Sequence, residues 1–209
     1  MRLGVFGGTF NPIHIGHLRA AEEVRENLAF DKIIFIPSFI PPHKNLKGVV
    51  EGHKRLEIVR RAIRECTGFD VSSFEIDQGG KSYSIRTLEH LLDIYNATPY
   101  FILGQDAFDE ISTWFDVKRL FSVAHFVVMS RPGSERKSLN KILGSIADTF
   151  QPHENGFVNK HNKKIIYIDI TPLDISSSAI RKMIKLGRSI KFLVPPEAES
   201  YIKQERIYT

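Results

Sequence analysis

The sequence predicts an α/β protein with a Rossmann-like architecture, an open and mainly parallel sheet with helices on both faces. Short apolar runs, typical of strands buried on both sides, alternate along the 209-residue chain with stretches whose apolar residues recur at helical spacing. Polar, loop-forming segments also follow four of these apolar runs. Such segments are expected where ligands bind, at the carboxyl ends of parallel strands.

The predicted elements follow one another in a regular order. The expected strands are the apolar runs at residues 3–6, 32–36, 69–76, 100–103, 125–129 and 164–170. The expected helices lie at residues 15–28, 53–66, 84–95 and 176–185, with one more between the fourth and fifth strands and one after Pro195-Pro196. Residues 132–162 are polar and less regular, apart from 139–146, and we expect a peripheral insertion there. We therefore expect a single domain over 1–209, with a small C-terminal helical portion from about residue 176.

The composition, 42% hydrophobic and 25% charged, is that of an ordinary globular protein. The one cysteine, Cys66, cannot form an internal disulfide, which favours a reducing, cytoplasmic setting. No apolar run approaches the roughly 20 residues of a membrane span, and no signal peptide is visible. The net charge of +5 suits small polyphosphates as well as nucleic acid. Because the basic residues are scattered and do not alternate with aromatic residues, we expect neither a nucleic-acid nor a membrane partner.

The segment from Gly7-Gly8-Thr9-Phe10 to His14-Ile15-Gly16-His17 is the strongest functional signal. Paired glycines after a strand let backbone N–H groups approach an anion, and the following helix start attracts negative charge. Histidines three positions apart on a first helical turn lie on the same side, where they can donate to phosphate oxygens and stabilise charge at phosphorus. A metal-binding pair or two surface histidines are the alternatives. Because Gly7 and Gly8 lie between the predicted strand and the histidines, a phosphate site is favoured over these alternatives.

Three other motifs have both a functional and an ordinary structural interpretation. The serines at 176–178 would cap a helix that carries Arg181, whose guanidinium could bind phosphate or simply face solvent. Asp106, just past a predicted strand, could accept hydrogen bonds from ribose hydroxyls or cap a helix. Trp114, the only tryptophan, would by itself be taken for a core residue.

In this order, the motifs resemble those of the nucleotidyltransferase superfamily that carries an H/T-x-G-H motif. The form GGTFNPIHIGHL looks like that of bacterial nicotinate mononucleotide adenylyltransferases. The resemblance continues over nearly the whole chain, through PPHK at 41–44, SYS at 82–84 with RTL at 86–88, GQD at 104–106, TWF at 113–115, SRPG at 130–133 and ISSSAIR at 175–181. The chain departs from many relatives in having Phe115 instead of Tyr and Ser84 instead of Thr. Neither change removes a backbone donor.

The resemblance implies that the adenylyl group of ATP is transferred to nicotinate mononucleotide, giving nicotinate adenine dinucleotide and pyrophosphate in NAD biosynthesis. It supports a catalytic role for His14, His17 and Arg181. The residues implied in ATP binding are Gly7, Gly8, Thr9, Phe10, His14, His17, Gly104, Asp106, Ser176, Ser178 and Arg181. Those implied in mononucleotide binding are Thr9, Lys44, Tyr83, Ser84, Asp106, Trp114 and Arg131. No protein-held metal is expected, and Mg²⁺ would be carried mainly by the ATP phosphates.

Several alternatives stay open at this point. Phosphopantetheine adenylyltransferases typically have Thr in place of His14 and a shorter chain. Nicotinamide mononucleotide differs from the nicotinate form by a hydrogen-bonding group, which one sequence cannot resolve. A class I tRNA synthetase fragment would need a Lys-Met-Ser-Lys-Ser-like loop, which is missing, and a non-catalytic sensor would bind ATP without releasing pyrophosphate. A homo-oligomeric assembly, loop closure on binding and the role of residues 133–162 are also undecided.

Overall fold

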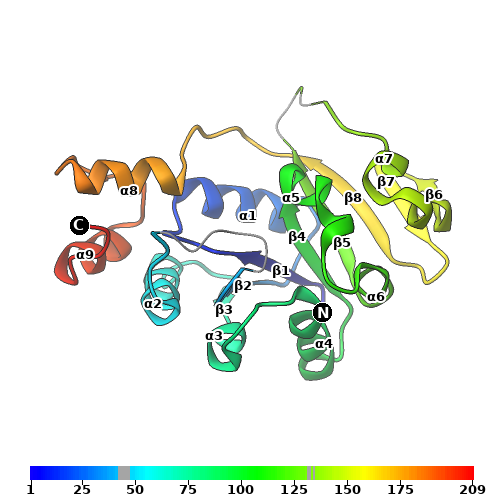
Figure 1. Cartoon of the computed structure of the whole chain (residues 1–209), viewed down its shortest axis with the longest axis horizontal. Coiled ribbons are helices and arrows are strands. Elements are labelled where there is room, and N and C mark those ends of the chain that lie inside the picture. Colours follow the sequence, from blue (N-terminus) through cyan, green and yellow to red (C-terminus); the bar gives the residue numbers. More distant parts are fainter. Residues whose placement is uncertain (42–47, 131–132, 134) are drawn as a thin grey trace.

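A computed structural model describes residues 1–41, 48–130, 133 and 135–209 of the chain (Figure 1). Within these residues, eight strands form one sheet with the order β3-β2-β1-β4-β5-β8-β7-β6. The strands are β1 (Leu3–Gly8), β2 (Lys32–Pro37), β3 (Phe69–Val71), β4 (Pro99–Gly104), β5 (His125–Ser130), β6 (Phe150–His153), β7 (Gly156–Asn159) and β8 (Lys164–Asp169). The first five strands and β8 run parallel, whereas β6 and β7 pair antiparallel. The predicted open, mainly parallel sheet is confirmed.

The helices connect these strands and cover both faces of the sheet. They are α1 (Ile15–Asn27), α2 (Gly52–Ala62), α3 (Phe74–Gln78), α4 (Ser84–Tyr95), α5 (Gln105–Asp109), α6 (Val117–Val123), α7 (Leu139–Leu143), α8 (Ser177–Lys185) and α9 (Pro196–Gln204), with 3-10 turns η1 (Ile111–Thr113) and η2 (Gly144–Thr149). Figure 1 shows α1 and α8 on one side of the sheet and α4 on the other. No helix in the described part of the chain is long and apolar enough to cross a membrane.

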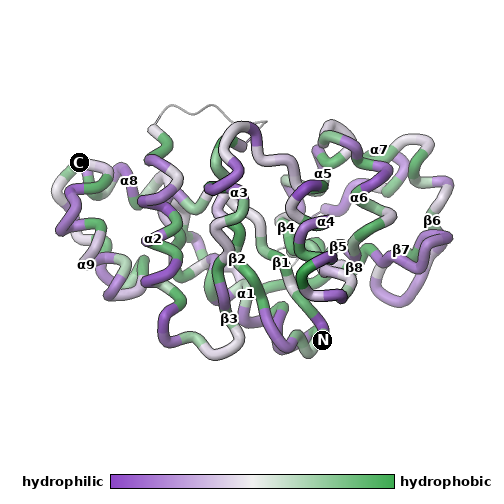
Figure 2. The backbone as a smooth tube through the Cα atoms, turned by 90° about the horizontal axis from the view of Figure 1, so that it is seen from below, coloured by the Kyte–Doolittle hydropathy of each residue, from purple (hydrophilic) through white to green (hydrophobic). Residues whose placement is uncertain are grey.

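The alternation of side chains along each strand divides the core into two clusters. In β2, Ile33 and Phe35 point toward α1, α2, α8 and α9, whereas Ile34 and Ile36 point toward α4, α6 and α7. Because both faces are covered, the central strands are apolar along their whole length. Figure 2 shows this as hydrophobic positions along β1, β2 and β4, with hydrophilic positions in the β6–β7 region at one end of the sheet.

The segment predicted as one strand over residues 69–76 is instead a short strand followed by a helix. β3 ends at Val71, and α3 begins at Phe74. The two serines between them explain the change, because the Phe74 N–H donates to the Ser72 hydroxyl (3.2 Å) and the Asp77 N–H donates to the Ser73 carbonyl (2.9 Å). Local bonds of this kind compete with strand pairing.

The segment predicted as an irregular insertion over residues 132–162 extends the main sheet. Its β6–β7 hairpin turns at Glu154-Asn155 and joins the edge of β8. Gly156 permits this pairing, since a Cβ at that position would lie 1.9 Å from the Ile165 carbonyl oxygen. The polar turn ending in Asn-Gly was the sequence signal for a hairpin.

The order of the strands fixes where a ligand would bind. The chain runs from β1 outward to β2 and β3, then returns to β4 on the opposite side of β1. A crevice therefore opens where the carboxyl ends of β1 and β4 diverge, at Gly8 and Gly104. Doubly wound sheets bind their ligands at this switch point.

Candidate active site

A pocket of about 370 Å³ opens at the switch point. Gly7, Gly8 and Thr9 line it from the end of β1, and Gly104 and Asp106 line it from the end of β4. The loop after β2 also contributes, so three of the four polar segments that follow the predicted strands meet here. Of the fourth, after β5, the structure describes Ser130, which is not among the lining residues of this pocket.

Glycine occupies these positions of the pocket for different physical reasons. A Cβ at Gly8 would lie 2.8 Å from the Phe10 ring, and one at Gly7 would lie 3.2 Å from the Phe101 ring. These glycines are therefore required by close packing rather than by an unusual backbone angle. A Cβ at Gly104 would meet nothing within 4 Å, so glycine there leaves open space in the pocket wall.

Aromatic side chains form the outer end of the pocket. The rings of Tyr83 and Phe115 lie 4.7 Å apart, and Trp114 packs edge-on against Phe101 at 6.0 Å. Phe115 is 56% exposed, which is unusual for a phenylalanine without a partner to bind. Trp114 thus packs against the core and lines the pocket at once, so its two sequence interpretations are compatible.

The start of α4 forms another part of the pocket wall, at Ser84. Its N-cap residue, Tyr83, makes no side-chain cap, and its first turn carries no acidic residue. The positive end of the helix dipole therefore faces the pocket without a charge of its own helix to offset it. Ser38, on the opposite wall, is 8% exposed, and its hydroxyl has no partner among the described residues. Both groups can bind a polar ligand.

His14 and His17 follow the Gly8-Thr9 segment in the chain and do not line the pocket, and the His17 ring lies 5.3 Å from that of Phe10. The ring centroids of the two histidines are 3.7 Å apart, and the backbone N–H of His14 donates to Nδ1 of the His17 ring (3.3 Å). The two imidazoles therefore lie on the same side of the helix start, as their spacing predicts. His14 is 6% exposed, and burial lowers its pKa to about 4. At neutral pH it is an uncharged hydrogen-bonding group.

The start of α1 is less open to an anion than the sequence suggests. The N–H of Ile15 donates to the Leu193 carbonyl oxygen (2.9 Å) and is therefore occupied. Gly16 allows the His14 ring to lie over the helix start, since a Cβ there would be 3.1 Å from His14 Nδ1. The imidazoles, more than the backbone of α1, are the donors at this point.

The start of α8 is bound to the same segment. Arg181 donates through Nη1 to the Asn11 carbonyl (2.8 Å) and through Nη2 to the Ser178 hydroxyl (3.3 Å). The Ser177 hydroxyl donates to the Pro12 carbonyl (2.8 Å). Ser176 is the N-cap and accepts from the Ala179 N–H (3.2 Å), while it and Ser178 remain exposed. Residues from both ends of the chain thus form one hydroxyl- and guanidinium-bearing surface beside the histidines.

Comparison with known proteins gives consistent results. A family model described as cytidylyltransferase-like matches residues 5–183. Proteins named "probable nicotinate-nucleotide adenylyltransferase" from Desulfatibacillum aliphaticivorans and Geotalea daltonii are each 44% identical to the whole chain, which covers 100% and 98% of their lengths. The chain belongs to the nicotinate-nucleotide adenylyltransferase family.

Solved structures agree on the fold of this family member. The Plasmodium falciparum nicotinic acid mononucleotide adenylyltransferase complexed with NaAD has a TM-score of 0.72 at 20% identity, covering 99% of this chain and 97% of that one. The same enzyme complexed with APC gives a TM-score of 0.71. The family resemblance and the α/β fold predicted from the sequence are both confirmed.

Arg55 is a site-forming residue of this adenylyltransferase that sequence reasoning missed. Its side chain is 1% exposed and donates to four backbone carbonyls. The acceptors are those of Val50 (2.7 Å), Thr9 (2.7 Å), Ser38 (2.7 Å) and Phe39 (3.1 Å). Arg55 therefore fastens the loop after β1 to the loop after β2. Nothing in the local sequence distinguishes it from the other basic residues of α2.

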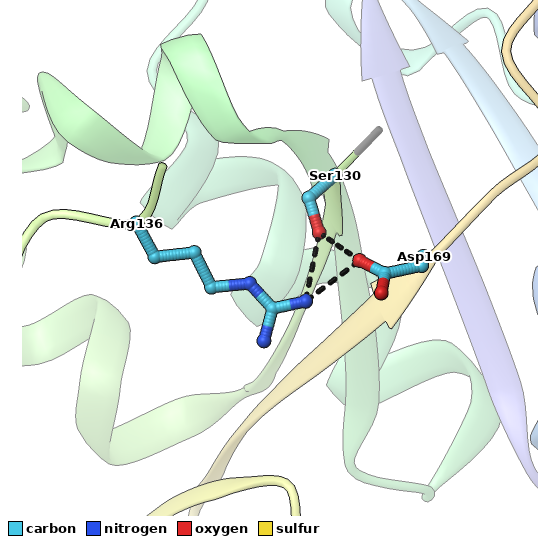
Figure 3. A network of polar contacts seen from close by, with 3 residues as sticks. All are labelled: Ser130, Arg136 and Asp169. Atoms are coloured by element: carbon cyan, nitrogen blue, oxygen red, sulfur yellow. Dashed lines mark hydrogen bonds and ion pairs between the residues drawn. The ribbon is translucent and has the colours of Figure 1, made fainter. Parts of the chain in front are cut away.

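A polar network joins the carboxyl ends of β5 and β8 (Figure 3). Arg136 donates through Nη2 to Asp169 (2.7 Å) and to the Ser130 hydroxyl (3.1 Å), which itself lies 2.7 Å from Asp169. The hydrogen bonds from Ser130 and Arg136 lower the pKa of Asp169. The network links Ser130, the last residue of β5, to the end of β8 and to Arg136.

Some of the predicted site residues either lie outside the described part of the chain or have a side chain too buried to contact a ligand. Lys44 and Arg131 lie outside the described residues. Phe10 is 3% exposed, with its ring 5.3 Å from that of His17, so only its backbone could meet a ligand. Among the residues that the structure describes, no group of three or more His, Cys, Asp or Glu side chains could hold a metal ion.

Proposed function

We propose that this chain transfers the adenylyl group of ATP to nicotinate mononucleotide, producing nicotinate adenine dinucleotide and pyrophosphate. One observation carries the proposal: Gly8 and Thr9 line a largely apolar pocket, and the segment that follows them brings together His14, His17 and Arg181, side chains that can donate to phosphate. A reaction that joins two nucleotides through their phosphates needs two such half-sites with a shared phosphate position. The names of its relatives support the same reaction.

In this mechanism the 5′-phosphate of the mononucleotide attacks the α-phosphorus of ATP in line. A new P–O bond forms to the acceptor as the bond to pyrophosphate breaks. A phosphate is already a competent nucleophile, so no general base and no covalent enzyme intermediate are required. Catalysis then consists of positioning two anions and stabilising the charge that develops on the transferred phosphorus.

The open half-site would bind the triphosphate. His14 and His17 would donate to the oxygens of the reacting phosphorus, and the low pKa of His14, about 4, supports a role as a neutral donor rather than as an acid. Arg181, Ser176 and Ser178 would hold the departing pyrophosphate. Gly7, Gly8, Thr9 and the backbone of Phe10 would complete the ATP site.

The pocket lined by aromatic side chains would bind the mononucleotide. Tyr83 and Trp114 would stack on the pyridine ring, and the start of α4 at Ser84 would face its carboxylate. Asp106, beside Gly104, would accept hydrogen bonds from ribose hydroxyls. Thr9 would contact both substrates, whereas Lys44 and Arg131 would pair with the acceptor phosphate.

Mg²⁺ fits this site as a companion of ATP rather than as a protein-held ion, since it retains waters and needs few protein ligands. When bound, it would supply neutralisation of the triphosphate charge. A cytoplasmic setting and the absence of nucleic-acid and membrane partners stay predictions from the sequence, as does homo-oligomer formation.

A product assay tests the proposed reaction. The chain is incubated with MgATP and either nicotinate mononucleotide, nicotinamide mononucleotide or phosphopantetheine, and pyrophosphate and the organic product are both quantified. We expect equal amounts of pyrophosphate and dinucleotide, with the nicotinate form turned over fastest. ATP binding without pyrophosphate release would favour a sensor, and a product with phosphopantetheine would favour the other adenylyltransferase.

A further inference from the structure

Glu75 is an acidic residue of the acceptor pocket to which the proposed mechanism gives no role. It lies on α3, is partly buried, and lines the pocket together with Tyr83, Ser84 and Trp114. Its Oε1 accepts a hydrogen bond of 2.5 Å from the hydroxyl of Thr87, in the first turns of α4. Its carboxyl group therefore lies close to the positive end of α4, the same feature that would attract an anionic ring substituent.

A second hydroxyl connects Glu75 to the opposite wall. Ser82 accepts a hydrogen bond from the Phe39 N–H (2.8 Å), and its hydroxyl hydrogen-bonds to Glu75. Ser82 and Thr87 stand on either side of the Tyr83-Ser84 turn. The carboxyl group of Glu75 thus interacts with hydroxyl groups on both sides of the turn that would meet the pyridine ring.

The surroundings of Glu75 oppose its ionisation on balance. Burial raises its pKa, and the hydrogen bonds from Thr87 and Ser82 and the charge of Arg55 offset this only in part. Other titratable or charged groups in the described residues around it include Asp77 on α3, Lys81 in the loop before α4, and Arg86 and His90 on α4, where His90 stacks on the ring of Phe74 at 3.8 Å. The pocket lining adds Tyr83, Asp106 and Glu110. No described basic side chain lines the pocket itself.

We propose that Glu75 is the specificity-determining residue by which the acceptor pocket distinguishes an anionic from a neutral ring substituent. This inference rests on the proposed function. As a neutral acid, Glu75 leaves the positive end of α4 free to attract a pyridine carboxylate and can donate a hydrogen bond into the pocket. As a carboxylate, it repels that substituent but has no such effect on a carboxamide.

The inference predicts a pH-dependent choice between two substrates. The ratio of kcat/KM for nicotinate over nicotinamide mononucleotide should fall about tenfold as the pH rises through the pKa of Glu75, because one like charge appears beside the carboxylate. Each substrate serves as the reference for the other. Titrations that affect catalysis in general therefore cancel in the ratio.

Two variants test the assignment to Glu75. Glu75→Gln keeps an acceptor for Thr87 but has no charge, so its substrate ratio should stay high and independent of pH. Thr87→Val removes a donor that favours the ionised form, so the midpoint of the change should move to higher pH. Asp77→Asn is the matched control, since Asp77 lies on the same helix but is exposed and outside the pocket. It should retain the pH dependence of the unmodified chain.

The binding of each mononucleotide is also measured directly, through the fluorescence of Trp114, the only tryptophan of the chain and part of the pocket wall. A pH-independent ratio in the unmodified chain would overturn the inference, as would a Glu75→Gln chain with the original pH dependence. If Glu75→Gln does not fold, an unmoved midpoint in Thr87→Val overturns it. Binding without turnover would contradict the proposed reaction alone. In that case, the pH dependence of the ratio of the two mononucleotides' binding constants would test the role of Glu75. Absence of both binding and turnover would contradict both proposals.

Discussion

The acceptor pocket and the half-site formed by the histidines and α8 are built in different ways. The acceptor pocket is largely apolar, contains five aromatic side chains, and is formed mainly by segments that follow β1, β2, β3 and β4. The histidine and α8 half-site is open, with Ser176 and Ser178 exposed, and depends on hydrogen bonds between residues 165 to 170 positions apart. Shape and burial can select a ring, whereas donors aimed at one point can stabilise a changing charge.

This difference leads to separate expectations for the two regions. Substitutions in the open half-site should lower kcat, because its donors act on the transition state. Substitutions in the pocket should raise the KM of the mononucleotide. Arg55 fastens loops of both regions and should affect both.

The largest effect is expected from His17→Ala. Loss of one donor to the developing charge should lower kcat by at least about a hundredfold, with a small change in the KM of either substrate. Steady-state kinetics measure both, and circular dichroism checks that the chain remains folded. A folded variant with near-normal turnover would remove His17 from the mechanism.

Arg55→Met should destabilise the whole molecule. Four backbone carbonyls would lose their donor in a buried place, at a cost of about 3 kcal/mol or more in the free energy of unfolding. Urea unfolding measures this change. Arg55→Lys keeps the charge but can reach fewer carbonyls, so its free energy of unfolding should lie between those of the unmodified chain and Arg55→Met. An unchanged unfolding midpoint in Arg55→Met would refute the role of Arg55 in fastening the loops.

Two histidines with lowered pKa values, one in the site and one at the opposite end of the strands, allow the effects of the site and of the fold to be separated. Burial lowers the pKa of both His14 and His125 to about 4, and His125 also accepts a hydrogen bond from the Lys164 N–H (3.0 Å). As the pH falls, these histidines are protonated in the unfolded chain before they are protonated in the folded chain. The free energy of unfolding should therefore decrease as the pH falls from about 6.5 toward 4. We expect a decrease of about 3 kcal/mol for His14 and a smaller one for His125, which is more exposed.

Substitution by Gln should remove each histidine's share of that pH dependence, as measured by unfolding at a series of pH values. His14→Gln should also lower turnover, whereas His125→Gln, at the opposite end of the strands, should leave turnover unchanged. Equal losses of turnover in both variants would show that the effect is structural.

The smallest effect is expected in the pocket. Trp114→Ala should raise the KM of the mononucleotide about tenfold and leave kcat nearly unchanged, because stacking contributes equally to the ground state and the transition state. Trp114→Phe keeps an aromatic face and should restore most of the affinity. A loss confined to kcat would contradict the division between the half-sites.

Local patterns predicted the parts of the site that depend on spacing. The three-residue interval between His14 and His17 placed both rings on one side, and the serines at 176–178 marked the start of α8. The role of Gly8 in phosphate binding stays a prediction, and the close Phe10 ring gives a separate reason for glycine at this position.

The residues that were missed depend on contacts distant in sequence. Arg55 resembles its exposed neighbours on α2, and only the folded chain brings four carbonyls around it. Glu75 lies in a segment that was interpreted as a strand, so its approach to Thr87 could not be foreseen. Burial of a single charged side chain leaves no periodic trace in the sequence.

The stereochemistry of transfer tests the central claim most directly. ATP carrying a chiral thiophosphate at the α-position is converted with nicotinate mononucleotide, and the configuration at phosphorus in the dinucleotide is determined. A single in-line displacement between the two half-sites predicts inversion. Retention would require a covalent enzyme intermediate and would contradict this account.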